Sequence, residues 1–338
     1  MTHEATIENR SVAVQSSSLQ QVTEPVQESL AVFRDFFKKE VSSDVWLLDR
    51  IIHYLLRQKG KEIRPTLVFM TARMFGEVDH RSYVGATMIE LLHTATLIHD
   101  DVVDEADMRR GFLSINKIWN NKAGVLLGDF LLSKGLLIAL DHQEHQLLSV
   151  LSDAVKKMSE GELRQLKTSN LFNMTEERYF QIISEKTASL ISACCQCGAI
   201  AATDNKEAIS TMAEIGMDIG IAFQIKDDLF DYGLADIGKP KRNDIKERKV
   251  TLPLIYALNH ASATEKLHIR RLMKKRNKSS RDIDRIVSFV YEKNGLALAE
   301  EKMNEFTGRA ISLLHTLPAE RGIEDFESLI NFIVTRKK

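Results

Sequence analysis

The sequence predicts an all-α fold, most simply one bundle of about ten or more helices around one core. Apolar residues recur at three-to-four-residue spacing over long stretches, which is typical of amphipathic helices. The alternating pattern of strands is almost absent. The 338 residues include only 16 glycines and 5 prolines, too few for the many tight turns of a β protein.

The elements follow one another in a simple order. Residues 1–22 are polar and lack an apolar period, so we expect a disordered tail before a single all-helical domain over residues 23–338. Helical stripes begin just after Pro25. Longer helices are expected at about 81–105, 122–140, 144–166, 175–202 and 206–233. Capping-box patterns at Ser262–Glu265 and Ser279–Asp282 predict two later helix starts.

Composition excludes several classes of protein. The formal net charge of −1 offers no overall field that would attract nucleic acid, and we expect no such partner. No stretch approaches the roughly 20 uncharged apolar residues of a membrane span, and no secretory signal is expected. Cys194, Cys195 and Cys197 lie too close together for a disulfide framework and lack partners for a zinc site. We expect buried thiols in a reducing cytoplasm.

The first acidic cluster lies late in the helix expected at 81–105. Asp100 and Asp104 are i,i+4 neighbours on a helix, and Asp101 and Asp104 are i,i+3 neighbours. The three carboxylates would converge near one side and repel one another unless a cation joined them. Such hard oxygen ligands suit Mg²⁺, which also bridges to substrate phosphates.

The second cluster, Asp227, Asp228 and Asp231, repeats the four-residue spacing of the first. One cluster alone is typical of a solvated acidic face. Both of these clusters, however, are embedded in apolar sequence. The repetition therefore favours two carboxylate clusters that face each other across a bundle and hold a metal–diphosphate.

Basic residues stand around the two clusters in chain order. A diphosphate needs cations from the protein, although each residue taken singly is typical of a solvated surface charge. Gly60 and Pro65 bracket two of them at an expected loop-to-helix junction. The basic residues and their polar neighbour are Lys61, Arg64, Arg109, Arg110, Lys186, Thr187, Lys239 and Lys249.

Together these residues resemble the trans-type prenyl diphosphate synthase (polyprenyl synthetase) family from about residue 25 onward. The most specific elements are Asp100 to Asp104 (DDVVD), Arg109 to Gly111 (RRG) and Gly220 to Asp231 (GIAFQIKDDLFD). Supporting elements are Gly60–Pro65 (GKEIRP), Leu127–Leu131 (LGDFL), Glu185–Leu190 (EKTASL) and Lys249–Pro253 (KVTLP). The resemblance implies an isoprenoid synthase fold with a central active-site cavity, and a homodimer.

The resemblance also implies roles for individual residues. Mg²⁺, with three ions per site, would be held by Asp100, Asp101, Asp104, Asp227, Asp228 and Asp231. The allylic diphosphate, such as farnesyl diphosphate, would bind Arg109, Lys186, Thr187, Gln224, Lys239 and Lys249. Isopentenyl diphosphate would bind Lys61, Arg64, His93 and Arg110. Catalysis would rest on Asp100, Asp101, Asp104, Lys186, Asp227 and Asp228, with released diphosphate taking the proton.

Two positions depart from the family pattern, and two others bear on product length. Lys59 and Arg248 stand where the family usually has glycine, and both keep or add positive charge. Ala95 and Thr96 lie about a turn and a half before the first aspartate, where bulky residues give short products in the family. Both are small, which favours a medium- or long-chain product, of the kind used for quinone side chains. Replacement of Ala95 by phenylalanine should then shorten the product.

Several alternatives stay open at this point. The chain could be a short-chain (farnesyl or geranylgeranyl) diphosphate synthase or a partner subunit of a heteromeric synthase. A class I terpene cyclase shares the first motif but normally has a different second one. A squalene- or phytoene-type synthase leaves the isopentenyl residues unexplained. A His-Asp phosphohydrolase built on His99-Asp100, with His53 or His93, leaves the second cluster unused.

Overall fold

The computed structural model describes residues 18–58, 60–109, 111–168, 174–233, 242–319 and 321–336. These residues are almost entirely helical, which confirms the predicted fold class. The helices of the first half are α1 (Leu19–Thr23), the 3-10 turn η1 (Glu24–Val26), α2 (Gln27–Val41), α3 (Trp46–Arg57), α4 (Ile63–Phe75), α5 (His80–Val103), α6 (Ile115–Trp119), α7 (Asn121–Asp141) and α8 (His145–Thr168).

The second half continues in the same manner. Its helices are α9 (Glu176–Ile183), the π-helical turn η2 (Ser184–Ala188), α10 (Ser189–Ala202), α11 (Lys206–Asp231), α12 (Asn243–Lys246), α13 (Leu252–Asn259), α14 (Ala263–Lys274), α15 (Ser280–Glu292), α16 (Gly295–Leu314) and α17 (Ile323–Thr335). Within the described ranges the strands are β1 (Met108–Arg109) and β2 (Phe112–Leu113), which pair antiparallel as a short hairpin.

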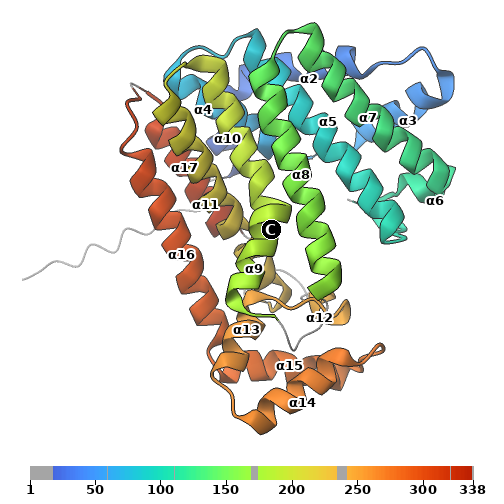
Figure 1. Cartoon of the computed structure of the whole chain (residues 1–338), viewed down its shortest axis with the longest axis vertical. Helices are drawn as coiled ribbons and strands as arrows, with labels where there is room; N and C mark the ends of the chain where they lie inside the picture. The colour runs from blue at the N-terminus through green and yellow to red at the C-terminus, as the bar shows by residue number, and fades with distance from the viewer. Residues whose placement is uncertain are drawn as a thin grey trace, which may run out of the picture.

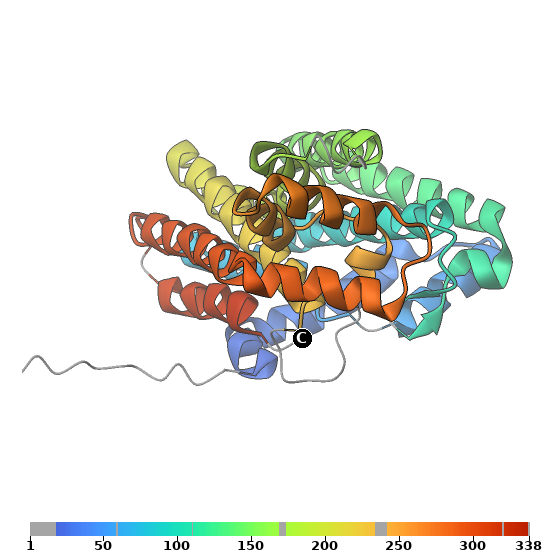
Figure 2. The same ribbon diagram turned by 90° about the horizontal axis from the view of Figure 1, so that it is seen from below.

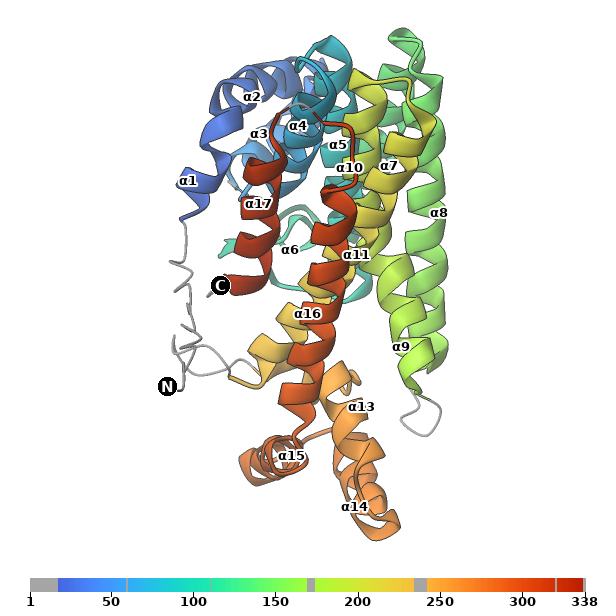
Figure 3. The same ribbon diagram turned by 90° about the vertical axis from the view of Figure 1, so that its left-hand side faces the viewer.

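The long helices form a bundle whose axis runs along the molecule (Figure 1). Helix α10 lies at its centre, packed against α4, α5, α8 and α11, and α11 packs in turn against α16. Seen from below, α16 and α17 lie on the side away from α7 and α8 (Figure 2). Helices α14 and α15 lie beyond one end of the bundle (Figure 3). The acidic clusters lie at the carboxyl ends of α5 and α11.

The predicted helices agree with the structure to within a few residues. Both expected capping boxes are present, with the Ser262 and Ser279 side chains accepting from the third helical N–H. A third capping box, between Ser18 and Gln21, starts α1 at Leu19. Residues 19–22 are therefore helical, and our boundary for the disordered tail was wrong. Helix α1 has only five residues, which is too short for an apolar period, so the periodicity could not reveal it.

Two helices, α7 and α11, are unusually long and apolar. By length and composition alone each could cross a membrane, contrary to our expectation that no stretch would qualify. More than half of the apolar window of α11 is buried in the bundle. On α7 only a third is buried, and Leu126, Leu137 and Leu140 are each more than 50% exposed. Helix α7 thus presents an apolar face that the described residues leave uncovered.

Candidate active site

A cavity of about 1080 Å³ opens inside the bundle and is lined by nine of the eighteen predicted site residues. Asp104 and the three aspartates of the second cluster are not part of its lining. Its charged lining includes Lys61, Arg64, Asp100, Asp101, Arg109 and Lys186. Apolar side chains from α2, α3, α5, α7, α8 and α10 complete the wall, among them Phe33, Leu55, Leu91, Leu131, Met158 and Leu190. Such a mixed wall suits a ligand with an anionic head and an apolar chain.

The three aspartates of the first cluster lie in different surroundings. Asp100 lines the cavity and is partly exposed. Asp101 is only 4% exposed, and both of its carboxylate oxygens accept from Arg109 Nε, at 2.7 and 2.8 Å. Asp104 follows the last residue of α5 as its exposed C-cap. The buried member therefore holds Arg109 at the cavity, while Asp100 and Asp104 keep accessible oxygens.

The second cluster is divided in the same way. Asp227 is the accessible member, and its carboxylate accepts from Arg336 Nη2. Asp228 and Asp231 are 4% and 9% exposed. Asp228 accepts from the Tyr179 hydroxyl at 2.7 Å, from Gln224 Nε2 at 3.2 Å and from the Leu252 amide at 3.1 Å. Its oxygens are thus engaged by the protein itself.

Burial disfavours the charged form of several carboxylates in this region. Burial raises the pKa of Asp100, and the nearby Glu162 carboxylate raises it further. Burial likewise raises the pKa of Asp227, against the opposing effect of Arg336. It raises the pKa of Asp228 to about 7, although the hydrogen bond from Tyr179 opposes the change. For Asp244, burial and the adjacent Asp231 raise the pKa to about 6. Added cations would relieve this crowding.

Lys186 and Thr187 lie on the π-helical turn η2, an irregularity that often marks functional sites. Lys186 forms an ion pair with Glu162 of α8, and Thr187 donates to Gln224 Oε1 at 3.0 Å. Two glycines allow neighbouring helices to approach this turn. A Cβ on Gly161 would lie 2.9 Å from the backbone nitrogen of Lys186, and one on Gly220 would lie 2.5 Å from the Ala188 Cα.

The residues expected to bind isopentenyl diphosphate also reach the cavity. Lys61, Arg64 and the buried His93 all line it. The Nε atoms of Arg64 and Arg336 are buried without a hydrogen-bond partner. Buried donors without an acceptor are costly, so these two guanidinium groups are arranged to receive an anion from the cavity.

The remaining predicted residues are distributed less simply. Lys249 forms an ion pair with Glu247, and its ammonium group interacts electrostatically with Asp244 and Asp104. Arg110 and Lys239 lie outside the described residues, as does Lys59. Thr96 lines the cavity, as expected.

The structure adds to the interpretation of two residues, Ala95 and Arg248. Ala95, expected beside Thr96 in the tunnel, is fully buried and is absent from the cavity lining. Thr94 and Thr96 on either side of it line the cavity, so the Ala95 side chain lies on the part of the α5 surface that is turned away from the cavity. Arg248, where the family usually has glycine, adopts φ +65°, the left-handed region that glycine favours.

Sequence reasoning missed three residues at the site. Arg336 pairs with Asp227 across 109 residues of chain, and no local pattern pointed to it. Glu162 pairs with Lys186, and its only signal was its place beside Gly161 on the face of α8. Tyr179 donates to Asp228 from α9. All three act through long-range contacts that periodicity does not reveal.

The donor set fits a hard divalent cation shared with a substrate. Among the described residues, no three His, Cys, Asp or Glu side chains converge closely enough to hold an ion alone. Mg²⁺ commonly takes one or two carboxylates and completes its shell with water and substrate phosphates. The accessible oxygens of Asp100, Asp104 and Asp227, with cationic donors nearby, match that requirement.

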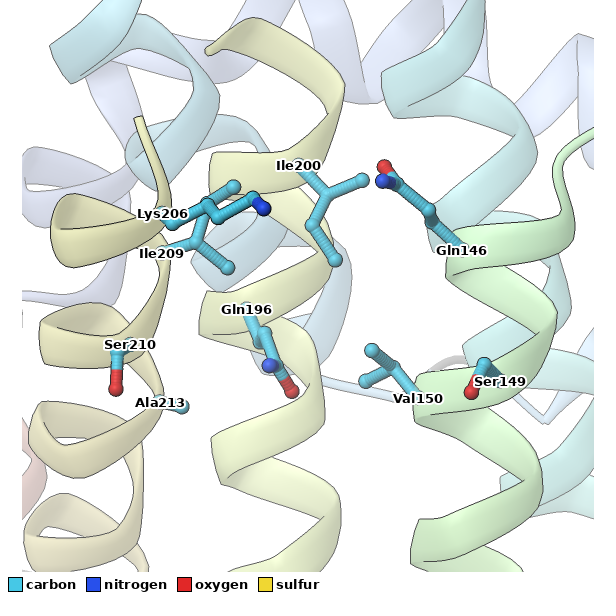
Figure 4. Close-up of a pocket in the computed structure, with 9 residues that line it drawn as sticks. All are labelled: Gln146, Ser149, Val150, Gln196, Ile200, Lys206, Ile209, Ser210 and Ala213. Atoms are coloured by element: carbon cyan, nitrogen blue, oxygen red, sulfur yellow. The ribbon is translucent and has the colours of Figure 1, made fainter. Parts of the chain in front are cut away.

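A second, open hollow of about 340 Å³ lies between α8, α10 and α11 (Figure 4). Amide and hydroxyl side chains such as Gln146, Gln196 and Ser210 surround it, with Lys206 at its edge. Its lining contains no carboxylate and none of the predicted site residues. The chemistry therefore belongs to the central cavity.

Comparison with known proteins places the chain in one family. The polyprenyl synthetase family model matches residues 45–290. The chain is 32% identical over 323 residues to octaprenyl diphosphate synthase of Escherichia coli K12, covering 95% of this chain and 100% of that one. The crystal structure of a decaprenyl diphosphate synthase from Rhodobacter capsulatus matches with a TM-score of 0.89 at 30% identity, over 95% of this chain and 100% of that one.

A further match is the polyprenyl synthase of Caulobacter crescentus, crystallised with calcium and isoprenyl diphosphate. Its TM-score is 0.87 at 29% identity, over 96% of this chain and 99% of that one. The family match covers more than half of the chain, and the structural matches span nearly all of it. The chain belongs to the polyprenyl synthetase family and is a prenyltransferase of the kind that makes long-chain polyprenyl diphosphates.

Proposed function

We propose that this prenyltransferase is Mg²⁺-dependent and extends an allylic diphosphate, such as farnesyl diphosphate, with isopentenyl diphosphate. One observation carries the proposal. A single cavity combines the Asp100 carboxylate, two guanidinium groups with unpaired N–H donors and a long apolar wall. One of these guanidinium groups, that of Arg336, also bonds Asp227. Charged head groups and a growing hydrocarbon chain would both find their partners there.

Mg²⁺ would be held by the carboxylates with accessible oxygens, Asp100 and Asp104 on one side and Asp227 on the other. When bound, it would stabilise the negative charge that develops on the departing diphosphate. The raised pKa values of Asp100 and Asp227, caused first by burial, support a cation at this position. The family resemblance leads us to propose three ions per site.

The protein's own cations would divide the two diphosphates between them. We assign Arg109, Lys186 and Lys249, with Thr187 and Gln224, to the allylic diphosphate. We assign Lys61, Arg64 and His93 to isopentenyl diphosphate. Lys186 would exchange its ion pair with Glu162 for the substrate. The double bond of isopentenyl diphosphate then attacks the allylic carbocation, and the released diphosphate takes the proton.

Three further features complete the proposal. Thr96 is small and lines the cavity, which supports an open path for repeated condensations. The exposed leucines of α7 support a homodimer in which two copies cover this face, rather than a membrane span.

The free, buried Cys194, Cys195 and Cys197 suit a reducing compartment and support a cytoplasmic location, which cell fractionation would test.

Titration of Mg²⁺ into the protein saturated with inorganic diphosphate tests the proposed site by calorimetry. Asp100→Asn and Asp227→Asn should each weaken Mg²⁺ binding at least about tenfold, because each removes a charged ligand. Asp153→Asn is the matched control, since Asp153 is an exposed aspartate of α8 that pairs with Lys157. Equal Mg²⁺ affinity in all three variants would refute the proposed site.

A further inference from the structure

Helices α12 and α13 both begin without a cap from their own sequence. The first N–H groups of a helix need an acceptor, which the N-cap side chain usually supplies. Arg242 precedes α12 with φ +51° and makes no capping bond. Thr251 precedes α13, and its hydroxyl bonds to the Tyr232 hydroxyl at 2.8 Å instead of to the helix.

The missing acceptors come from the second acidic cluster on α11. Asp231 Oδ1 accepts from the Asn243 amide at 2.8 Å, and Oδ2 accepts from the Asp244 amide at 3.2 Å. Asp228 Oδ2 accepts from the amide of Leu252, the first residue of α13, at 3.1 Å. Both carboxylates are buried, so these charge-assisted bonds are made away from competing water.

The segment between these two anchors carries Lys249. Its amide donates to the Asp244 carbonyl at 2.8 Å, which ties the lysine to the anchored end of α12. Its ammonium group interacts electrostatically with Asp104 of the first cluster. The two caps therefore determine where the Lys249 charge stands relative to both clusters.

The first cluster has a parallel arrangement. There the buried Asp101 holds Arg109 through both carboxylate oxygens, while Asp100 faces the cavity. In each cluster a buried aspartate is bonded to the protein, and a more accessible one is left for cations. The four-residue spacing repeats in the sequence, but Asp104 is an exposed C-cap whereas Asp231 is a buried acceptor.

We propose that Asp228 and Asp231 are positioning residues that cap α13 and α12 from α11 and so hold Lys249 at the site. Asp227 is then the one member of its cluster that binds the cation. This inference rests on the proposed roles of Asp227 and Lys249. It changes the expected ligand set, in which all three aspartates were metal ligands.

Asparagine substitutions separate the two roles, because an amide keeps an oxygen acceptor for the helix N–H but loses the ligand charge. In the Mg²⁺–diphosphate titration, Asp231→Asn should stay within about threefold of wild type, whereas Asp227→Asn loses at least about tenfold. In hydrogen exchange, Asp231→Ala should raise the exchange rate of residues 243–246 about tenfold, and Asp231→Asn much less. Asp228→Asn should likewise leave Mg²⁺ affinity near wild type.

A double variant tests the link to Lys249. Asp231→Ala and Lys249→Ala should each raise the KM of the allylic substrate, and the double variant should be little worse than Lys249→Ala alone.

Loss of Mg²⁺ affinity in Asp231→Asn to the level of Asp227→Asn, with unchanged exchange at residues 243–246, would overturn the inference. Because the asparagine variant keeps an acceptor, that result stands even if Asp231→Ala fails to fold. Normal Mg²⁺ affinity in Asp227→Asn would instead contradict the proposed metal site. Hydrogen exchange at residues 243–246 would still test whether Asp231 caps α12.

Discussion

Arg336 donates a hydrogen bond to Asp227, 109 residues earlier in the chain, and its guanidinium carbon lies 3.9 Å from the ring centroid of Phe223. The last residue that the structure describes thus covers the accessible carboxylate of the second cluster. This guanidinium therefore balances the charge of Asp227 through a direct hydrogen bond.

Removal of that cation should matter most when no metal is present. Arg336→Ala leaves the Asp227 carboxylate, whose side chain is 43% exposed, without its partner, so the metal-free protein should lose about 1 kcal/mol of unfolding free energy. With Mg²⁺ and inorganic diphosphate the loss should shrink, because other cations then neutralise Asp227. Thermal unfolding with and without Mg²⁺ measures this, and an equal loss in both conditions would contradict it. Arg285→Ala, on an exposed pair with Glu292, is the control.

The acidic clusters should be indispensable for turnover. Asp100→Asn and Asp227→Asn should each lower kcat/KM at least about 100-fold, because each removes charge that would hold the cation at the leaving group. Initial rates with labelled isopentenyl diphosphate give the values. Asp153→Asn should keep the wild-type rate. A loss of less than about threefold in both active-site variants would exclude a role for these carboxylates in the chemical step.

Product length should respond to Thr96 because this residue lines the cavity. Thr96→Phe adds a ring to the wall and should shorten the longest product by several isoprene units. Thr96→Val has nearly the same shape and should leave the product length unchanged. Chromatography of the dephosphorylated products compares them. If the phenylalanine variant makes the wild-type product, the growing chain takes another path.

The left-handed backbone at Arg248 predicts an unusual order of stability. With φ +65°, a β-branched residue is strained there, so Arg248→Val should lose about 1 kcal/mol of unfolding free energy. Arg248→Gly should be at least as stable as Arg248→Val, and near wild type, because glycine adopts this conformation freely. Urea unfolding measures both. A valine variant as stable as the glycine variant would show that the backbone is not constrained at this position.

Charge on the open face of α7 should break the dimer that we propose. Leu137 is 53% exposed, so Leu137→Glu should fold normally but sediment as a monomer at concentrations where wild type is a dimer. Leu267→Glu on α14, where the leucine is 44% exposed, is the control and should remain dimeric. Analytical ultracentrifugation distinguishes the two. A wild-type chain that is already monomeric would end this part of the proposal.

The sequence predicted what depends on local periodicity. The long helices, the positions of both clusters at the ends of α5 and α11, and two capping boxes follow from spacing within a few turns. The site residues on α4, α5 and η2 also meet in one cavity, as their order around the clusters suggested.

What the sequence could not supply depends on contacts between distant segments. Apart from the bond that Gln224 donates within α11, the hydrogen bonds that occupy Asp228 and Asp231 come from α9, α12 and α13, and no spacing within α11 predicts them. Ala95 and Thr96 look equivalent in the sequence, but the direction of each on α5 decides which one lines the cavity. Arg336 reaches Asp227 only because α17 folds back beside α11.

The most direct test of the account is to incubate the purified protein with isopentenyl diphosphate and farnesyl diphosphate, with Mg²⁺ or with excess chelator, and to size the products by mass spectrometry. We expect a series that ends well beyond geranylgeranyl length with Mg²⁺ and no extension with chelator. Products that stop at farnesyl or geranylgeranyl length would contradict the open tunnel. Extension that persists in chelator, or none with Mg²⁺, would contradict the central claim that these two clusters and divalent metal ions drive the condensation.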